Sequence, residues 1–223
     1  LKQECGVDEG ARIHLTKRIP PAAGLGGGSS DAAATLRGLN TFWRLGLSEN
    51  RLLEVARTLG SDVPALVLGG TVHLAGTGDI VTRIPSLHPT HFVLIKPGVH
   101  VPAAKTATLY AGLAPEMFTD GSRTASALRS LELNHTIPAA FICNVFERVA
   151  PQSFPGIDSE MAAFARLSHS TVHLAGSGPT LFAVTNSAAD ASIMAVGLKA
   201  ARWEAFAVES ISHTQAPSGT DSL

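Results

Sequence analysis

A run of glycines between two differently patterned segments constrains the fold of this chain more than any other feature. The run occupies residues 24–30, in which four glycines and one leucine are followed by two serines. Residues 11–19 before it alternate apolar and polar side chains, as a strand does, and residues 32–43 after it carry apolar side chains at helical spacing. Glycine lets backbone N–H groups converge without obstruction by a Cβ atom, and the N–H groups at the start of a helix attract anions. We therefore expect this glycine segment to bind phosphate.

Two common nucleotide-binding motifs do not fit the glycine segment. The P-loop needs Gly-Lys-Ser/Thr at a fixed distance, and this sequence has none there. The dinucleotide-binding fingerprint needs a third glycine where Ser29 stands. Ser29, Ser30 and Asp31 suit the N-terminal cap of the following helix, so a serine-capped turn is the structural alternative to a phosphate site. Four closely spaced glycines before a capped helix favour phosphate.

The overall composition limits the classes of partner. The chain has 223 residues, 45% of them hydrophobic and 16% charged, with a formal net charge of −1. These values are typical of a globular protein with a substantial core, and they offer no basic field for nucleic acid or an anionic membrane. The most apolar stretch, residues 63–75, is interrupted by Pro64 and two glycines and is too short to span a membrane. Cys5 and Cys143 imply no disulfide framework, which favours a reducing, cytoplasmic compartment.

Zinc chemistry and serine hydrolysis find no support in the sequence. None of the nine histidines forms a pair at zinc-ligand spacing on a convincing helix. No Gly-x-Ser-x-Gly motif is present. We therefore predict no metal site built from protein side chains.

Turn residues and periodicity divide the chain into two predicted domains, residues 1–86 and 87–212. The boundary is placed in residues 85–90, which contain two prolines and little periodicity. Residues 213–223 are rich in Ser, Thr, Pro and Gly and are predicted to be a disordered tail.

Each domain is predicted to mix helices and strands. In the first domain, Ser48 caps a helix over residues 49–59, and residues 71–75 and 80–84 form a hairpin through a glycine-containing turn. The elements expected in the second domain are a strand at 92–95, helices at 103–113, 124–131, 144–150, 158–167 and 188–198, and strands at 171–174, 180–184 and 206–211.

Residues 17–33, Lys-Arg-Ile-Pro-Pro-Ala-Ala-Gly-Leu-Gly-Gly-Gly-Ser-Ser-Asp-Ala-Ala, resemble the nucleotide-binding motif of the GHMP kinases. The long glycine run followed by Ser-Ser-Asp is similar to that of the 4-diphosphocytidyl-2-C-methyl-D-erythritol kinases in particular. Residues 59–64 resemble the segment that carries the catalytic aspartate of that family, and residues 97–102 resemble a substrate-side loop. Residues 144–147 resemble a helix start in the second domain, and residues 175–180 resemble the third GHMP motif.

The resemblance implies an α+β protein with the two-domain GHMP kinase fold. Its N-terminal part is similar to ribosomal protein S5 domain 2, shortened here at its start, and its C-terminal domain is ferredoxin-like. ATP is the implied phosphate donor, with Mg²⁺ held mainly by the nucleotide, and a monomer or homodimer is expected. The residues implied to bind ATP are Pro20, Pro21, Ala22, Ala23, Gly24, Leu25, Gly26, Gly27, Gly28, Ser29 and Ser30. Those implied to lie on the substrate side, or to support the site, are Pro102, Gly176, Ser177 and Gly178.

Asp62 takes the catalytic position in this resemblance. It precedes Pro64, which suits the first turn of a short helix, so capping that helix is the structural alternative. The two roles are compatible. In phosphoryl transfer, one carboxylate near the acceptor hydroxyl can orient that hydroxyl and receive its proton. The implied acceptor is the 2-hydroxyl of the methylerythritol unit, in the non-mevalonate isoprenoid pathway.

One expectation concerns the start of the chain. The family begins with a strand that bears a lysine and an asparagine, and the sequence from Leu1 onward has no such strand. We therefore expect the chain as given to be inactive or badly impaired, with a sheet edge and an apolar helix face of the first domain left uncovered. Two alternatives stay open: a GHMP kinase for another small alcohol, and a nucleotide-binding GHMP protein without catalysis.

Overall fold

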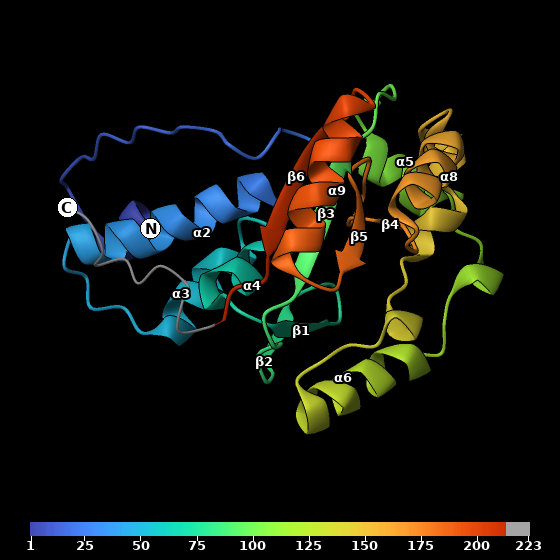
Figure 1. Ribbon diagram of the computed structural model, residues 1–223. Helices are drawn as coiled ribbons and strands as arrows, with labels where there is room; N and C mark the ends of the chain where they lie inside the picture. Colours follow the sequence, from blue (N-terminus) through green and yellow to red (C-terminus); the bar gives the residue numbers. More distant parts are fainter. Residues whose placement is uncertain (213–223) are drawn as a thin grey trace. The chain divides into compact units, whose positions relative to one another are not determined.

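The computed structural model describes residues 1–212, which form two compact units (Figure 1). The first unit comprises Leu1–Pro21, Gly26–Ser86 and the described residues after Ser210. The second comprises Ala22–Leu25 and Leu87–Ser210. The glycine segment is thus divided between the two units: Gly24 and Leu25 belong to the second unit, and residues 26–30 belong to the first. The predicted tail, residues 213–223, lies outside the described residues.

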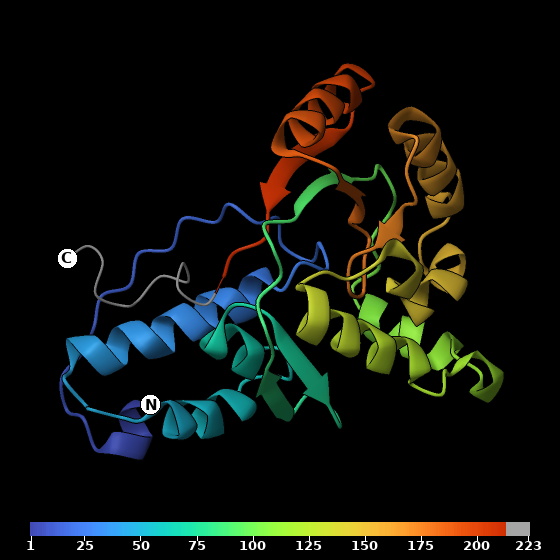
Figure 2. The ribbon, with the colours of Figure 1, turned by 60° about the horizontal axis from the view of Figure 1, so that its bottom comes forward.

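The first unit consists mainly of helices that pack around one core. Its elements are α1 (Lys2–Cys5), α2 (Gly27–Phe42), α3 (Glu49–Arg57), α4 (Val63–Leu68), β1 (Val72–Ala75) and β2 (Ile80–Arg83). The core consists of small and aliphatic side chains of α2, α3 and α4: Ala33, Leu36, Leu52, Leu53, Val55, Ala56, Val63, Val67 and Leu68. These apolar residues recur at helical spacing, so burying them together brings the three helices side by side, as Figure 2 shows.

Two predicted features of this unit are confirmed. Helix α3 begins after Ser48, whose Oγ accepts a hydrogen bond from the Arg51 N–H at 3.3 Å. Strands β1 and β2 pair antiparallel, with Val72 opposite Arg83, as the predicted hairpin required.

The strand predicted at residues 11–19 is wrong. This segment is irregular and forms no strand pairing within the described part of the chain. Ile13 and Leu15 are 61% and 57% exposed. Alternation predicts which side chains share a face, but a strand also needs a neighbour for its backbone hydrogen bonds. The apolar side chains of the segment are consequently open to solvent.

The second unit is an antiparallel sheet with helices. Its elements are β3 (His91–Lys96), α5 (Lys105–Gly112), η1 (Pro115–Met117), α6 (Ser122–Asn134), η2 (Ala139–Phe141), η3 (Val145–Arg148), α7 (Ala150–Ser153), α8 (Ile157–Ser168), β4 (His173–Leu174), β5 (Leu181–Thr185), α9 (Ala188–Ala200) and β6 (Glu204–Glu209). The strand order is β4-β5-β3-β6, and every neighbouring pair is antiparallel. Helix α9 covers one face of this sheet (Figure 1).

The core of the second unit is centred on β3. Val93 and Ile95 are fully buried because β5 and β6 flank this strand and α9 packs on it. The helix predicted at residues 144–150 is replaced by the 3-10 turn η3 and the short helix α7. Pro151 stands in the first turn of α7, where its missing N–H cannot continue a helix from the preceding turn. None of the helices in residues 1–212 has the length and apolar character of a membrane span.

Candidate active site

Helix α2 begins inside the glycine segment. Its N-cap is Gly26, with φ of +65°, and its first helical residues are Gly27, Gly28 and Ser29. The Ser30 N–H donates to the Gly26 carbonyl at 2.8 Å, whereas the N–H groups of the three residues before Ser30 have no partner among residues 1–212. Unpaired N–H groups at the positive end of a helix macrodipole are donors for an anion.

The prediction that Ser29, Ser30 and Asp31 cap this helix is wrong. All three lie inside its first two turns. The helix starts earlier because Gly26, without a Cβ atom, adopts the left-handed N-cap conformation at little cost. The hydroxyls of Ser29 and Ser30 donate no hydrogen bond within the described residues, so they stay available to a ligand.

A lysine lies beside the start of α2. Lys17 Nζ pairs with the carboxylate of Asp31, in the second turn of the helix. A Cβ atom on Gly27 would lie 3.6 Å from this Nζ and only 2.9 Å from Ile19 Cγ2, so a larger residue would not fit without a shift. The lysine charge therefore stands at the same end of α2 as the unpaired N–H groups.

Asp62 stands at the N-cap position of α4, but its side chain does not cap that helix. The residue is exposed, and its carboxylate has no hydrogen bond or ion pair among the described residues. Asp62 thus has the predicted position at the helix start, but its side chain makes no capping hydrogen bond. A free carboxylate is consistent with a role toward a ligand.

Packing of α2 against α4 brings Asp62 and the start of α2 into one region of the first unit. A Cβ atom on Gly26 would lie 3.6 Å from Leu66 Cδ1, and Arg37 Nη1 donates to the carbonyls of Leu66 and Val67 at 2.9 and 3.1 Å. Leu66 follows Asp62 by four residues, which is about 6 Å along a helix axis. The predicted catalytic carboxylate and the predicted phosphate-binding N–H groups therefore belong to neighbouring helix starts.

The second unit contains the other predicted loop, residues 175–180, docked on residues 22–25. The Thr180 N–H donates to the Ala23 carbonyl at 3.2 Å. Gly24, with φ of +79°, approaches the loop so closely that a Cβ atom would lie 2.5 Å from Ala175 O and 2.6 Å from Gly178 O. The beginning of the glycine segment therefore contacts residues 175–180, which we call the third loop because they resemble the third GHMP motif.

Three side chains that hold the third loop were missed as site residues by sequence reasoning. Asn144 Nδ2 donates to the carbonyls of Leu174 and Gly176, at 2.9 and 2.8 Å. Glu147 Oε1 accepts the Leu174 N–H at 2.9 Å. Lys105, the first residue of α5, donates from Nζ to third-loop carbonyls. Only Asn144 and Glu147 carried a signal, since their segment resembled a family motif.

Pro102 is the predicted substrate-side residue that lies outside the third loop. Its carbonyl accepts the Lys105 N–H at 3.2 Å, so Pro102 shapes the start of α5.

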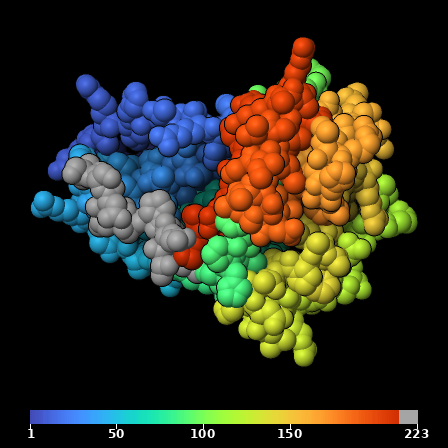
Figure 3. All heavy atoms as spheres, in the orientation of Figure 1, coloured from blue at the N-terminus to red at the C-terminus, as the bar shows by residue number. Residues whose placement is uncertain are grey.

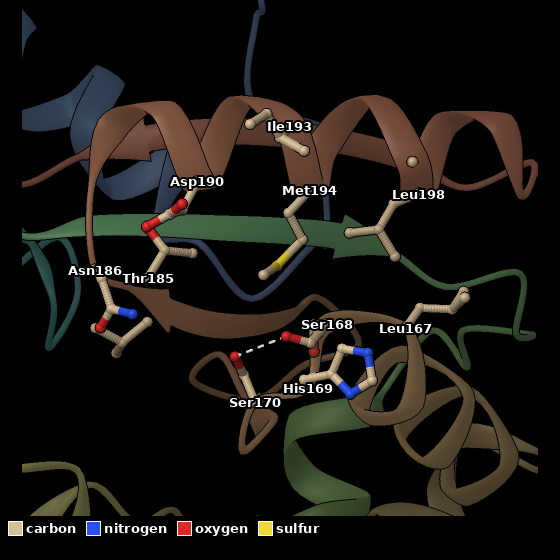
Figure 4. Close-up of a pocket in the computed structure, with 12 residues that line it drawn as sticks. Leu167, Ser168, His169, Ser170, Thr185, Asn186, Asp190, Ile193, Met194 and Leu198 are labelled. Carbon is tan, nitrogen blue, oxygen red and sulfur yellow. Dashed lines mark hydrogen bonds between the residues drawn. The ribbon is translucent and has the colours of Figure 1, made fainter.

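A cavity of about 690 Å³ lies in the second unit between the end of α8, β5 and α9 (Figure 4). Its lining includes His169, Asp190 and Met194 and none of the predicted site residues. Ile193 beside it is 72% exposed, and the outer surface of α9 is open in Figure 3. Among the described residues, no group of three or more His, Cys, Asp and Glu side chains is arranged to hold a metal ion.

Comparison with known proteins places the chain in a family. Residues 1–70 match the model of the GHMP kinases N terminal domain. The chain is 38% identical over 215 residues to the 4-diphosphocytidyl-2-C-methyl-D-erythritol kinase of Shouchella clausii, a match that covers 95% of this chain and 70% of that protein. The chain belongs to the 4-diphosphocytidyl-2-C-methyl-D-erythritol kinase family. It is also 40% identical over 182 residues to the same-named protein of Dehalococcoides mccartyi, covering 82% of this chain but only 64% of that relative's length.

Solved structures agree with this family membership. A crystal structure of 4-(cytidine 5'-diphospho)-2C-methyl-D-erythritol kinase matches with a TM-score of 0.77 at 32% identity, covering 93% of this chain and 74% of that one. The homoserine kinase of Cytophaga hutchinsonii matches with a TM-score of 0.67 at 20% identity, covering 88% of this chain and 68% of that one, and shows the shared fold alone. The predicted α+β GHMP kinase fold is therefore confirmed for this diphosphocytidyl-methylerythritol kinase family member.

Proposed function

We propose that the protein transfers the γ-phosphoryl group of ATP to the 2-hydroxyl of 4-diphosphocytidyl-2-C-methyl-D-erythritol, in the formation of isoprenoid precursors. The observation that carries the proposal is the pairing of two helix starts in a member of this kinase family. One start offers unpaired N–H groups at Gly27, Gly28 and Ser29, and the other offers the free carboxylate of Asp62. Donors for phosphate beside one free base are what phosphoryl transfer to an alcohol requires.

The start of α2 is proposed to hold the ATP phosphates. Its N–H groups and macrodipole would bind phosphate oxygens, and Lys17, which is paired with Asp31, lies beside Gly27. The hydroxyls of Ser29 and Ser30, in the same turn, can reach a phosphate oxygen or the metal ion that accompanies it. Mg²⁺ would arrive bound to ATP, where it neutralises charge on the phosphates.

Asp62 is proposed to orient the acceptor hydroxyl and to receive its proton. Its carboxylate is exposed and makes no capping bond, so binding a substrate would break no existing contact. The third loop and Pro102, which belong to the second unit, are proposed to contact the substrate or to support its binding. Because the chain has only Cys5 and Cys143 and no disulfide framework, we also propose a cytoplasmic location.

The proposal is tested by measuring ADP formation from Mg·ATP with 4-diphosphocytidyl-2-C-methyl-D-erythritol. Both the 223-residue chain and the product of the longest reading frame that contains it are assayed. Asp62→Asn should lower kcat by roughly 100- to 10,000-fold while leaving the Kd for Mg·ATP within about threefold, because general-base residues act on the reaction and not on nucleotide binding. Asp158→Asn, at an exposed aspartate in the first turn of α8, is the control and should leave kcat unchanged.

The outcomes separate the proposal from its alternatives. Acceptor-dependent ADP release that requires Asp62 supports the kinase assignment. Turnover with homoserine or mevalonate, and none with the diphosphocytidyl substrate, would instead assign a GHMP kinase for another alcohol. Nucleotide binding by a folded protein with no turnover of any acceptor would make the protein a binding protein and the proposed activity wrong.

A further inference from the structure

Lys105 is a buried lysine whose ammonium group binds backbone carbonyl oxygens. It is the first residue of α5 and is only 8% exposed. Its Nζ donates to the Ser177 carbonyl at 3.3 Å and to the Gly178 carbonyl, so both bonds end in the third loop. The next residue, Thr106, donates from Oγ1 to Ser177 Oγ at 3.1 Å. Helix α5 therefore anchors this loop at two successive positions.

The charge of Lys105 is not balanced within the structure. No carboxylate forms an ion pair with it in residues 1–212. Burial lowers its pKa below the ordinary lysine value, which measures the cost of keeping the ammonium charged there. The first turn of a helix adds to that cost, because the macrodipole disfavours a cation at this end. A buried ammonium with this surplus of positive charge favours an anion nearby.

Side-chain donors bind the carbonyl groups of the third loop and leave two of its N–H groups without a partner among the described residues. Asn144 takes the carbonyl of Gly176, and Lys105 takes those of Ser177 and Gly178. The N–H groups of Gly176 and Ser177, in contrast, have no partner in the described part of the chain. When consecutive carbonyls are held on one side by side-chain donors, the N–H groups are left for an external acceptor.

We propose that Lys105 is a positioning residue for nucleotide binding: it holds the third loop so that the Gly176 and Ser177 N–H groups receive phosphate oxygens, and it supplies the positive charge behind them. This inference rests on the proposed function, because the anion it requires is the phosphate chain of ATP. Lys105 acts through the loop and does not itself touch the reacting atoms.

The test compares Lys105→Met with Lys199→Met, which removes an exposed lysine near the end of α9 in the same unit. The Kd for Mg·ATP is measured by calorimetry, and kcat and KM for ATP are measured where turnover is seen. Lys105→Met should raise the Kd and the KM for ATP by roughly 10- to 100-fold, the loss expected for charged hydrogen bonds, with a smaller change in kcat. Lys199→Met should leave all three unchanged.

Hydrogen exchange of the ligand-free protein gives a readout independent of ATP. The amide hydrogens of Ala175 and Gly178, which donate to the Thr180 and Ala175 carbonyls, should exchange at least about tenfold faster in Lys105→Met than in wild type, while those of β3 stay unchanged. If wild type does not bind ATP, the proposed function fails, and the exchange data still decide whether Lys105 orders the loop. Equal Kd values and equal exchange in Lys105→Met and wild type would overturn the inference.

Two conservative variants keep the test decisive if Lys105→Met does not fold. Lys105→Arg keeps the positive charge, and Lys105→Gln keeps a donor without the charge. Lys105→Arg should bind Mg·ATP at least about five times more tightly than Lys105→Gln, since charged hydrogen bonds are stronger than neutral ones. Equal affinities of these two variants would show that the charge has no role, and the inference would be wrong.

Discussion

The two glycine-rich segments of this protein are ordered in opposite ways. At the start of α2, the backbone itself provides the order: Gly26 takes the N-cap conformation and the Ser30 N–H closes the first turn. The polar side-chain contact beside it is the half-exposed pair of Lys17 and Asp31. The third loop instead depends on side chains from distant parts of the sequence, with Lys105 as the buried one.

The difference follows from what each segment connects. A loop that runs into a helix passes its backbone groups to the helical hydrogen-bond pattern after a few residues. The third loop connects β4 to β5, so the carbonyls of Leu174, Gly176, Ser177 and Gly178 need donors from elsewhere. We infer that the first segment tolerates loss of neighbouring polar side chains and that the third loop does not.

The largest effect is expected where the glycine segment meets the third loop. Gly24→Ala should lower the free energy of unfolding by about 2–4 kcal/mol, because alanine is strained at a φ of +79° and its Cβ would lie 2.5 Å from Ala175 O. Urea denaturation followed by circular dichroism measures this change.

The control for this substitution is a glycine with open space around it. Gly38, in the middle of α2, has no atom within 4 Å of an added Cβ, so Gly38→Ala should raise the free energy of unfolding by about 0.5–1 kcal/mol. A Gly24→Ala protein as stable as wild type would show that the docking of residues 22–25 on the third loop is not as close as described.

A smaller loss is expected from removing one anchor of the third loop. Asn144→Ala deletes the donors to the Leu174 and Gly176 carbonyls and the acceptor for the Phe146 N–H. The free energy of unfolding should fall by about 1–3 kcal/mol, because these backbone groups lose partners in a partly buried place. Asn186→Ala, in the surface turn before α9, is the control and should change stability by less than about 0.5 kcal/mol. If Asn144→Ala lowers the free energy of unfolding no more than the control does, the third loop keeps its structure without the Asn144 hydrogen bonds.

The same contrast explains what sequence reasoning could predict. The prediction that residues 24–30 bind phosphate rests on local features, glycines before a helical pattern, and the structure has helix α2 in that place. Local preference predicts Ser29 and Ser30 as the helix caps, but the N-cap is Gly26, whose left-handed conformation costs little without a Cβ atom. The strand at residues 11–19 was wrong because pairing depends on a partner that alternation alone does not supply.

The anchors of the third loop could not be predicted from local pattern. Lys105 lies 73 residues from Gly178, and Asn144 lies 32 residues from Gly176. Neither separation leaves a periodic signal in the sequence, and a lysine at a helix start is most simply taken as a solvated surface residue. Only the packing of α5 and η3 around the β4–β5 connection makes these side chains donors to the loop.

The smallest effect is expected at the start of α2. Lys17→Met removes one partner of the ion pair with Asp31, whose two side chains are 32% and 34% exposed. Such pairs contribute about 0–1 kcal/mol and weaken with salt, so the free energy of unfolding should change by less than about 1 kcal/mol. A double-mutant cycle with Asp31→Asn, measured by urea denaturation at low and high salt, isolates the coupling between the two residues. A helix start that is ordered by its backbone gains little from an exposed ion pair. A coupling above about 2 kcal/mol would therefore mean that side chains hold this segment in place, as they do the third loop.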